Sequence, residues 1–118
     1  MPETTQPVPN EYVEFWNYTL AVKFERFREI LMNGLSYHSR MPLSRLNIKP
    51  GARILDVGCG WGDTTIQLAR MTGPTGFVLG LDCVDQFLET GRREARAAGL
   101  DNVRFLDADV ETCPFESD

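Results

Sequence analysis

The second half of the chain alternates between short apolar runs and segments whose apolar residues recur at helical spacing. The runs lie at residues 54–57 and 77–82, and a third begins at Val103 and ends in an acidic loop. Ile54, Leu55 and Val57 are too apolar for a strand with one wet face, so the first run predicts a fully buried, central parallel strand. The order β-α-β-α-β predicts an α/β fold with a doubly wound parallel sheet.

Two helices are expected between these strands, at residues 64–71 and at about 85–98. Val84 has no capping side chain, so the cap of the second helix is expected from Asp85. Two right-handed crossovers in one direction give the strand order 3-2-1 and place both helices on the same face. The other face and the free edge of the first strand are then bare unless the N-terminal helices or another chain cover them. The apolar stripe of the second helix consists of Val84, Leu88, Gly91, Ala95 and Ala98.

The first half of the chain predicts helices rather than strands. Residues 1–9 contain three prolines and two threonines but no apolar cluster, which predicts a disordered tail. Asn10 can cap a long helix from Glu11 to about Asn33 that Gly34 ends, and a shorter helical piece is expected near residues 41–46. The apolar stripe of the long helix consists of Tyr12, Trp16, Leu20, Phe24, Phe27 and Leu31, with Phe15 and Ile30 beside it.

A glycine-rich turn connects the first predicted strand to the helix expected at residues 64–71. Gly58, Gly60 and Gly62 alternate in ILDVGCGWG, where a backbone without Cβ can adopt positive φ and approach a ligand closely. A helix N-terminus follows, which suits an anionic group. A dinucleotide fingerprint starting at Gly58 would need its third glycine at position 63, which is Asp63. A nicotinamide-dependent oxidoreductase therefore fits the fold but fails at this position.

Composition and charge restrict the classes of partner. The 118 residues allow one domain, and the net charge of −5 argues against a nucleic-acid partner because the phosphate backbone would be repelled. No apolar run approaches membrane-spanning length, and the N-terminus lacks a signal-peptide core. Cys59, Cys83 and Cys113 lack metal-ligand spacing, so we expect no metal and reduced thiols in a cytoplasmic protein.

Three motifs at successive strand ends carry a resemblance to a known family. They are Asp56 with the glycines of the turn, FVLGLD ending at Asp82, and VRFLDADVETCPF with Asp109. In this pattern the chain resembles the class I S-adenosylmethionine-dependent methyltransferases, particularly the small-molecule type similar to ubiquinone and menaquinone biosynthesis enzymes. The resemblance covers residues 50–115 and implies a Rossmann-like half domain over residues 50–118, preceded by a helical cap over residues 10–49.

The resemblance also implies S-adenosylmethionine as the cofactor and a role for each motif. Asp56 and the Gly58–Gly60 turn would hold the methionine end, Asp82 the ribose hydroxyls, and Asp109 the adenine amino group. The Val110 N–H would reach an adenine ring nitrogen, and all three acids should line one cleft. The full set of expected cofactor-binding residues is Asp56, Gly58, Cys59, Gly60, Gly62, Asp82, Cys83, Asp109 and Val110.

Each assignment has a simpler structural alternative. Asp56 can brace the turn, Asp82 can cap the following helix, and Asp109 can be merely solvated. The N-terminal aromatic residues can be core, or they can form a lid that walls the acceptor pocket, with Tyr12, Trp16 and Tyr37 as its candidates. His38 can act as a general base or be solvated, and we assign no catalytic residue.

The sequence therefore predicts methyl transfer from S-adenosylmethionine to a small-molecule acceptor, whose identity and reacting atom stay open. Members of the family usually continue with four more strands, whereas this chain stops at Asp118. We therefore expect an incomplete class I methyltransferase fold that is either a truncated product or half of a larger assembly. The partner would be a complementing C-terminal half or a second copy of the chain. The alternative function is a non-catalytic methyltransferase-like partner that dimerises through its exposed first strand.

Overall fold

The computed structural model describes residues 10–115, and of residues 36–41 only the backbone. The predicted tail over residues 1–9 and the side chains of Tyr37 and His38 therefore lie outside the described part. The elements in chain order are α1 (Glu11–Phe15), the π-helix η1 (Trp16–Leu20), α2 (Ala21–Arg26), α3 (Arg28–Arg45), β1 (Arg53–Val57), α4 (Asp63–Thr72), β2 (Phe77–Asp82), α5 (Asp85–Ala97) and β3 (Val103–Asp107).

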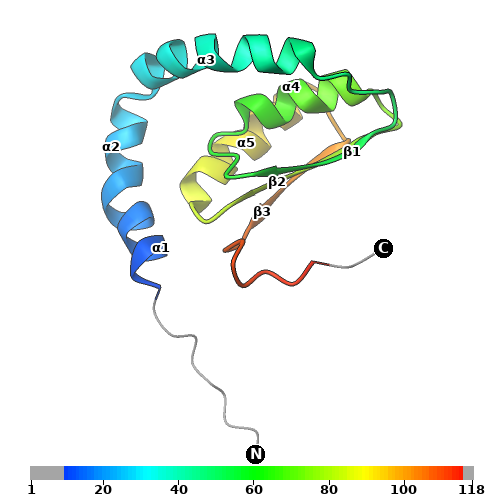
Figure 1. The fold of residues 1–118 in the computed structure, drawn as a ribbon. Coiled ribbons are helices and arrows are strands. Elements are labelled where there is room, and N and C mark those ends of the chain that lie inside the picture. The colour runs from blue at the N-terminus through cyan, green and yellow to red at the C-terminus, as the bar shows by residue number, and fades with distance from the viewer. Residues whose placement is uncertain (1–9, 116–118) are drawn as a thin grey trace, which may run out of the picture.

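The three strands form one parallel sheet with β2 in the middle, and the order β1-β2-β3 is the predicted 3-2-1 order seen from the other edge. Leu55 pairs with Leu79, which in turn pairs with Arg104. Helices α4 and α5 lie on the same face of this sheet, as predicted, and the described chain leaves the opposite face open (Figure 1).

Strand β1 is not buried on both faces, so that prediction was wrong. Ile54 packs against the cluster of Leu68, Ala69 and Val78, whereas the side chains of Leu55 and Val57 are 46% and 51% exposed. The cause is the position of β1 at the edge of a sheet that is covered by helices on one side only. An apolar run in a sequence indicates that both faces of a strand are suited to burial, but it does not show whether anything covers the second face.

The two helices lie close to the sheet because small residues face one large ring. A Cβ at Gly62 would stand 2.6 Å from the Phe105 ring, and one at Gly91 would stand 2.9 Å from it. The predicted stripe of α5 is buried through Val84, Leu88, Gly91 and Ala95, with Ala98 exposed at the helix end. Close packing here places the N-termini of both helices beside the carboxyl ends of the strands.

The N-terminal helices form an arc that passes from the carboxyl ends of the strands over α4 (Figure 1). Asn10 caps α1 as predicted, its Oδ1 accepting from the backbone N–H groups of Tyr12 and Val13 at 3.1 and 3.3 Å. The predicted end at Gly34 was wrong, because α3 continues to Arg45 and includes all but the last residue of the helical piece expected near 41–46. A single glycine weakens a helix but does not end it unless it adopts a left-handed conformation.

The long helix is instead interrupted by η1 and by Phe27, whose φ of −111° and ψ of 19° are not helical. This break turns Phe27 out of the apolar stripe and leaves it 50% exposed. Trp16, Phe24 and Leu31 keep their predicted role and pack against a buried cluster of Ala21, Trp61, Val84 and Phe87. The N-terminal helices are therefore anchored on the ends of α4 and α5 rather than on the open face of the sheet.

The packing at Gly62 generates a stability prediction. Gly62 has φ 85° and no room for a Cβ, whereas Gly60 has φ 57° and nothing within 4 Å of that position. Gly60→Ala should lower the free energy of unfolding by about 1–2 kcal/mol through left-handed strain alone. Gly62→Ala should cost about 1–3 kcal/mol more, because its methyl group overlaps the Phe105 ring. Urea unfolding of both variants measures the difference, and equal losses would contradict this packing.

Candidate functional site

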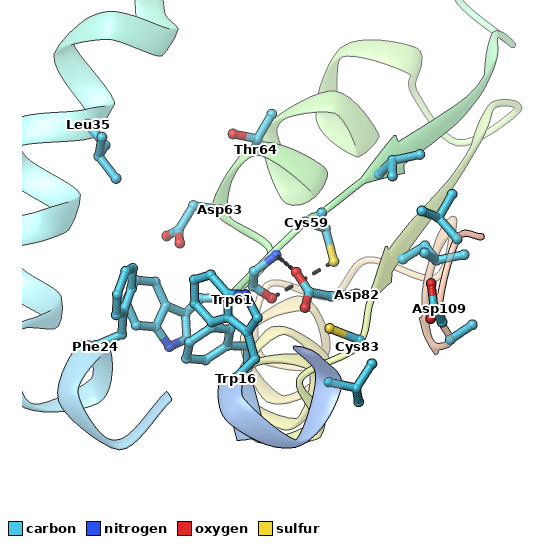
Figure 2. A pocket seen from close by; sticks show the side chains of 18 of the residues that line it. Trp16, Phe24, Leu35, Cys59, Trp61, Asp63, Thr64, Asp82, Cys83 and Asp109 are labelled. Atoms are coloured by element: carbon cyan, nitrogen blue, oxygen red, sulfur yellow. Dashed lines mark hydrogen bonds between the residues drawn. The ribbon is translucent and has the colours of Figure 1, made fainter. Parts of the chain in front are cut away.

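A cavity of about 640 Å³ lies at the carboxyl ends of the strands, between the glycine turn and the N-terminal helices (Figure 2). Such crevices outside the carboxyl ends of parallel strands are where open α/β sheets bind ligands. Of the residues predicted to bind the cofactor, Asp56 and Gly62 do not line this cavity. Those that do are Gly58, Cys59, Gly60, Asp82, Cys83, Asp109 and Val110, together with the lid candidates Tyr12 and Trp16.

The glycine turn is held against the end of β2 by its own backbone. Gly58 and Gly60 have φ of 70° and 57°, in the left-handed region predicted for them. The N–H groups of Gly58 and Cys59 both donate to the carbonyl oxygen of Leu81, at 2.7 and 3.1 Å. The turn therefore presents backbone atoms to the cavity without side chains at two of its positions.

Asp82 fixes the turn and the start of α5 with one carboxylate (Figure 2). Its Oδ2 accepts from the N–H of Gly60 at 2.9 Å, and its Oδ1 accepts from the N–H of Val84 at 3.0 Å. Helix α5 has no side-chain cap of its own, so the expectation that Asp85 caps it was wrong. An ionised carboxylate can accept about four hydrogen bonds. Asp82 thus keeps acceptor capacity for a ligand while it orders the loops around the cavity.

Asp56 lies beneath the turn rather than in the cavity. Its Oδ2 accepts from the hydroxyl of Thr65 at 2.8 Å on the face that α4 covers. Burial raises the pKa of Asp56, and the charge of Asp82 adds to the rise while the Thr65 hydrogen bond opposes it. The expectation that all three acids line one cleft was therefore wrong for Asp56. Successive strand side chains point to opposite faces, and Asp56 falls on the helix-covered one.

Asp109 connects the loop after β3 to the beginning of α1. Its Oδ2 accepts from the Asn10 side-chain amide at 2.7 Å, and its Oδ1 accepts from the N–H of Glu111 at 3.0 Å. A second side-chain amide connects the N-terminal helices to a loop at the strand ends: Asn17 Nδ2 donates to the carbonyl oxygen of Cys83 at 2.8 Å. These two amides hold the N-terminal helices across the mouth of the cavity. Sequence reasoning missed both contacts, because an asparagine at a helix start or within a helix does not specify a distant partner.

Aromatic residues form the opposite wall of the cavity. The rings of Trp16 and Phe24 meet edge-to-face at 5.3 Å. Trp61 donates its indole N–H to Glu25 at 2.7 Å, and the Arg28 guanidinium lies 5.3 Å from the centre of its ring. Trp16 both packs on the core and lines the cavity, so the two alternatives for it are compatible, while Tyr12 lines the cavity but is 65% exposed.

Cys59 is a half-buried thiol whose ionisation the surroundings disfavour. Its sulfur packs toward the core cluster around Phe105. Burial, followed by the charges of Asp82 and Asp56, raises the pKa of Cys59 to about 12. Burial also raises the pKa of Cys83. Among the side chains that the structure describes, which exclude those of residues 36–41, no group of three or more acidic, cysteine or histidine residues is placed to hold a metal ion. None of the described helices has the length and apolar character required to cross a bilayer.

Comparison with known proteins gives consistent similarities. A sequence profile of a methyltransferase-domain family matches residues 48–118. The ubiquinone/menaquinone biosynthesis C-methyltransferase UbiE of Ectopseudomonas mendocina is 35% identical over 100 residues, which cover 83% of this chain and 39% of that protein. Demethylmenaquinone methyltransferase of Bacillus cytotoxicus is 41% identical over 71 residues, covering 60% of this chain and 30% of that protein. The chain thus spans about two fifths or less of the length of these relatives.

Solved structures resemble the same region. A SAM dependent methyltransferase from Aquifex aeolicus aligns with a TM-score of 0.57 and 28% identity, covering 63% of this chain and 39% of that one. Coclaurine N-methyltransferase, solved with N-methylheliamine and SAH, aligns with a TM-score of 0.58 and 28% identity, covering 64% of this chain and 22% of that one.

The Asn10–Asp109 contact generates a prediction about the N-terminal helices. Asn10→Asp keeps a good helix cap but places a second carboxylate against Asp109. We expect amide exchange in α1 to become roughly five- to tenfold faster, as the loss of about 1 kcal/mol implies. Asn10→Ser is the matched control, because it also caps the helix and adds no charge, and its effect should be smaller. Unchanged exchange in Asn10→Asp would show that the contact does not hold α1 in place.

The raised pKa of Cys59 predicts low reactivity. The thiolate is the reacting form, and at pH 8 a thiol with a pKa of about 12 is ionised in roughly one molecule in ten thousand. In a Cys83→Ser/Cys113→Ser background, maleimide should modify Cys59 at least about a hundredfold more slowly in the folded protein than in urea. The rate should increase as pH rises, because ionisation follows the raised pKa. Equal rates in the two states would contradict burial of this thiol.

Proposed function

The chain belongs to the methyltransferase-domain family, and on this basis we propose that it forms the S-adenosylmethionine-binding part of an enzyme that methylates a small-molecule acceptor. The observation that carries the proposal is the convergence of the left-handed glycine turn, Asp82 and Asp109 on one cavity at adjacent strand ends. In this proposal, residues 50–118 are the cofactor-binding half domain and residues 10–49 are its helical cap.

We propose that the cofactor lies along the strand ends. The Gly58–Gly60 turn contacts its methionine end through backbone atoms, and the free acceptor capacity of Asp82 receives the ribose hydroxyls. Asp109 accepts from the adenine amino group, and the Val110 N–H donates to a ring nitrogen. Cys59 and Cys83 flank the site, Gly62 seats α4 against Phe105, and Asp56 braces the turn through Thr65.

The charge of the cavity supports a cationic ligand. Three acids, Asp63, Asp82 and Asp109, are among the described lining residues, and those residues include no lysine, arginine or histidine. Negative charges in a partly desolvated cavity attract a sulfonium ion and repel a pyrophosphate. This balance favours S-adenosylmethionine over a nicotinamide dinucleotide.

The proposed reaction is an in-line displacement at the sulfonium methyl group. A nucleophilic atom of the acceptor forms the new bond to the methyl carbon as the C–S bond breaks, and the electron pair of that bond stays on sulfur in S-adenosylhomocysteine. The site contributes positioning and exclusion of water, and the arc of N-terminal helices beside the cavity would support both. Trp16 and Tyr12, with Tyr37 as a third candidate, would wall the acceptor pocket.

The open face of the sheet supports a need for more protein around this half domain. Leu55, Val57 and Leu106 are 46%, 51% and 40% exposed on that face or its edge. Burying such surface stabilises an assembly by about 25 cal/mol per Å². We propose that a C-terminal complement or a second copy covers it in the working protein. The same surface favours the second candidate function, a non-catalytic partner that dimerises through β1.

We further propose that the protein is cytoplasmic, which its three free cysteines support.

The ribose assignment predicts the effect of Asp82→Asn on ligand binding. The neutral side chain loses charged hydrogen bonds worth about 1.5–3 kcal/mol each, so S-adenosylmethionine should bind roughly 10- to 100-fold more weakly. Calorimetry with S-adenosylmethionine and with NAD measures this, and NAD should not bind measurably. Asp101→Asn is the control, since this exposed acid lies before β3 and does not line the cavity. Unchanged S-adenosylmethionine affinity, or comparable binding of NAD, would contradict the proposal.

A further inference from the structure

Asp63 is an acid of the cavity to which no role has been assigned. It is the first residue of α4 and lines the cavity on the side of the N-terminal helices, as its labelled side chain shows (Figure 2). The side chain is half-buried, and its carboxylate interacts with the backbone N–H of its own residue but forms no hydrogen bond or ion pair with another described side chain. Asp82 and Asp109, in contrast, each accept two hydrogen bonds within the protein.

The surroundings of Asp63 compensate its charge only in part. Arg28 is the nearby cation, but its guanidinium is paired with Glu94 at 2.7 Å and lies over the Trp61 ring. Burial raises the pKa of Asp63, and Glu94 adds to the rise while Arg28 opposes it. A partly desolvated carboxylate of this kind is stabilised when a cation enters the cavity beside it.

The cofactor carries such a cation at its amino-acid end. Asp56, which the sequence assigned to that end, is engaged with Thr65 outside the cavity. Thr64 and Gln67 line the cavity next to Asp63 and offer a hydroxyl and an amide for the adjoining carboxylate group of the ligand. The first turns of α4 thus present one acid and two neutral polar side chains to an ammonium–carboxylate pair.

We infer that Asp63 binds the α-ammonium group at the amino-acid end of the cofactor and takes the place that the sequence gave to Asp56. The inference rests on the proposed function. It assigns to Asp63 a charge-assisted hydrogen bond to the ligand, accepted by a carboxylate that no other described side chain engages by a hydrogen bond or an ion pair.

Binding of three ligands distinguishes the contribution of the ammonium group from that of the rest of the cofactor. S-adenosylmethionine carries both the ammonium and the sulfonium charge, S-adenosylhomocysteine carries only the ammonium, and 5′-methylthioadenosine carries neither. Asp63→Asn should weaken the binding of the first two by a similar factor of roughly 10–100, as loss of a charged hydrogen bond implies. Binding of 5′-methylthioadenosine should not change. Calorimetry on the full chain measures all three.

Asp56→Asn is the matched control, because it also neutralises an acid next to the turn. It should leave the relative affinities for the three ligands unchanged. Equal affinities of Asp63→Asn and the original protein would overturn the inference and leave the proposed function standing. An equal loss for all three ligands would show a structural role, and a loss for S-adenosylmethionine alone would place the sulfonium beside Asp63; both overturn the inference. Failure of the original protein to bind any of the ligands would overturn the proposed function itself.

Discussion

The architecture of the cavity depends on the hydrogen bonds that the carboxylate of Asp82 accepts. This carboxylate receives the N–H of Gly60 from the turn after β1 and the N–H of Val84 from the start of α5. The neighbouring carbonyl of Leu81 receives two further N–H groups of the turn. The end of the middle strand, β2, therefore fixes both the glycine turn that follows β1 and the start of helix α5. A loop held from outside can keep left-handed glycines facing a ligand, although ordering it costs conformational entropy.

The N-terminal helices complete this arrangement from the other side. The amides of Asn10 and Asn17 reach the loops after β3 and β2, and Trp61 of the glycine turn is held by Glu25 and Arg28. Segments from both ends of the chain thus meet at the strand ends. The acids that face the cavity and the aromatic rings opposite them combine an attraction for cations with an apolar wall.

Much of the fold follows from the sequence because apolar runs and glycines restrict the backbone strongly. The three strands, the two helices on one face and the Asn10 cap were predicted, and the comparisons confirm the expected family, its Rossmann-like fold and S-adenosylmethionine as its cofactor. The failures have local physical causes. Gly34 lies within a helix, Asp56 points to the covered face, and the apolar character of β1 did not reveal its exposed face. Long-range side-chain contacts, such as that of Asn10 with Asp109, have no sequence signature, and the ligand contacts of the site residues remain predictions.

The most direct test of the central claim is an NMR titration of the backbone amides with S-adenosylmethionine. If the turn, Asp82 and Asp109 form one binding site, saturable shifts should appear together at Gly58, Gly60, Cys83 and Val110, with a single dissociation constant. Amides on the open face of β1, such as that of Leu55, should shift little. An absence of saturable shifts, or shifts concentrated on the open face, would contradict the account.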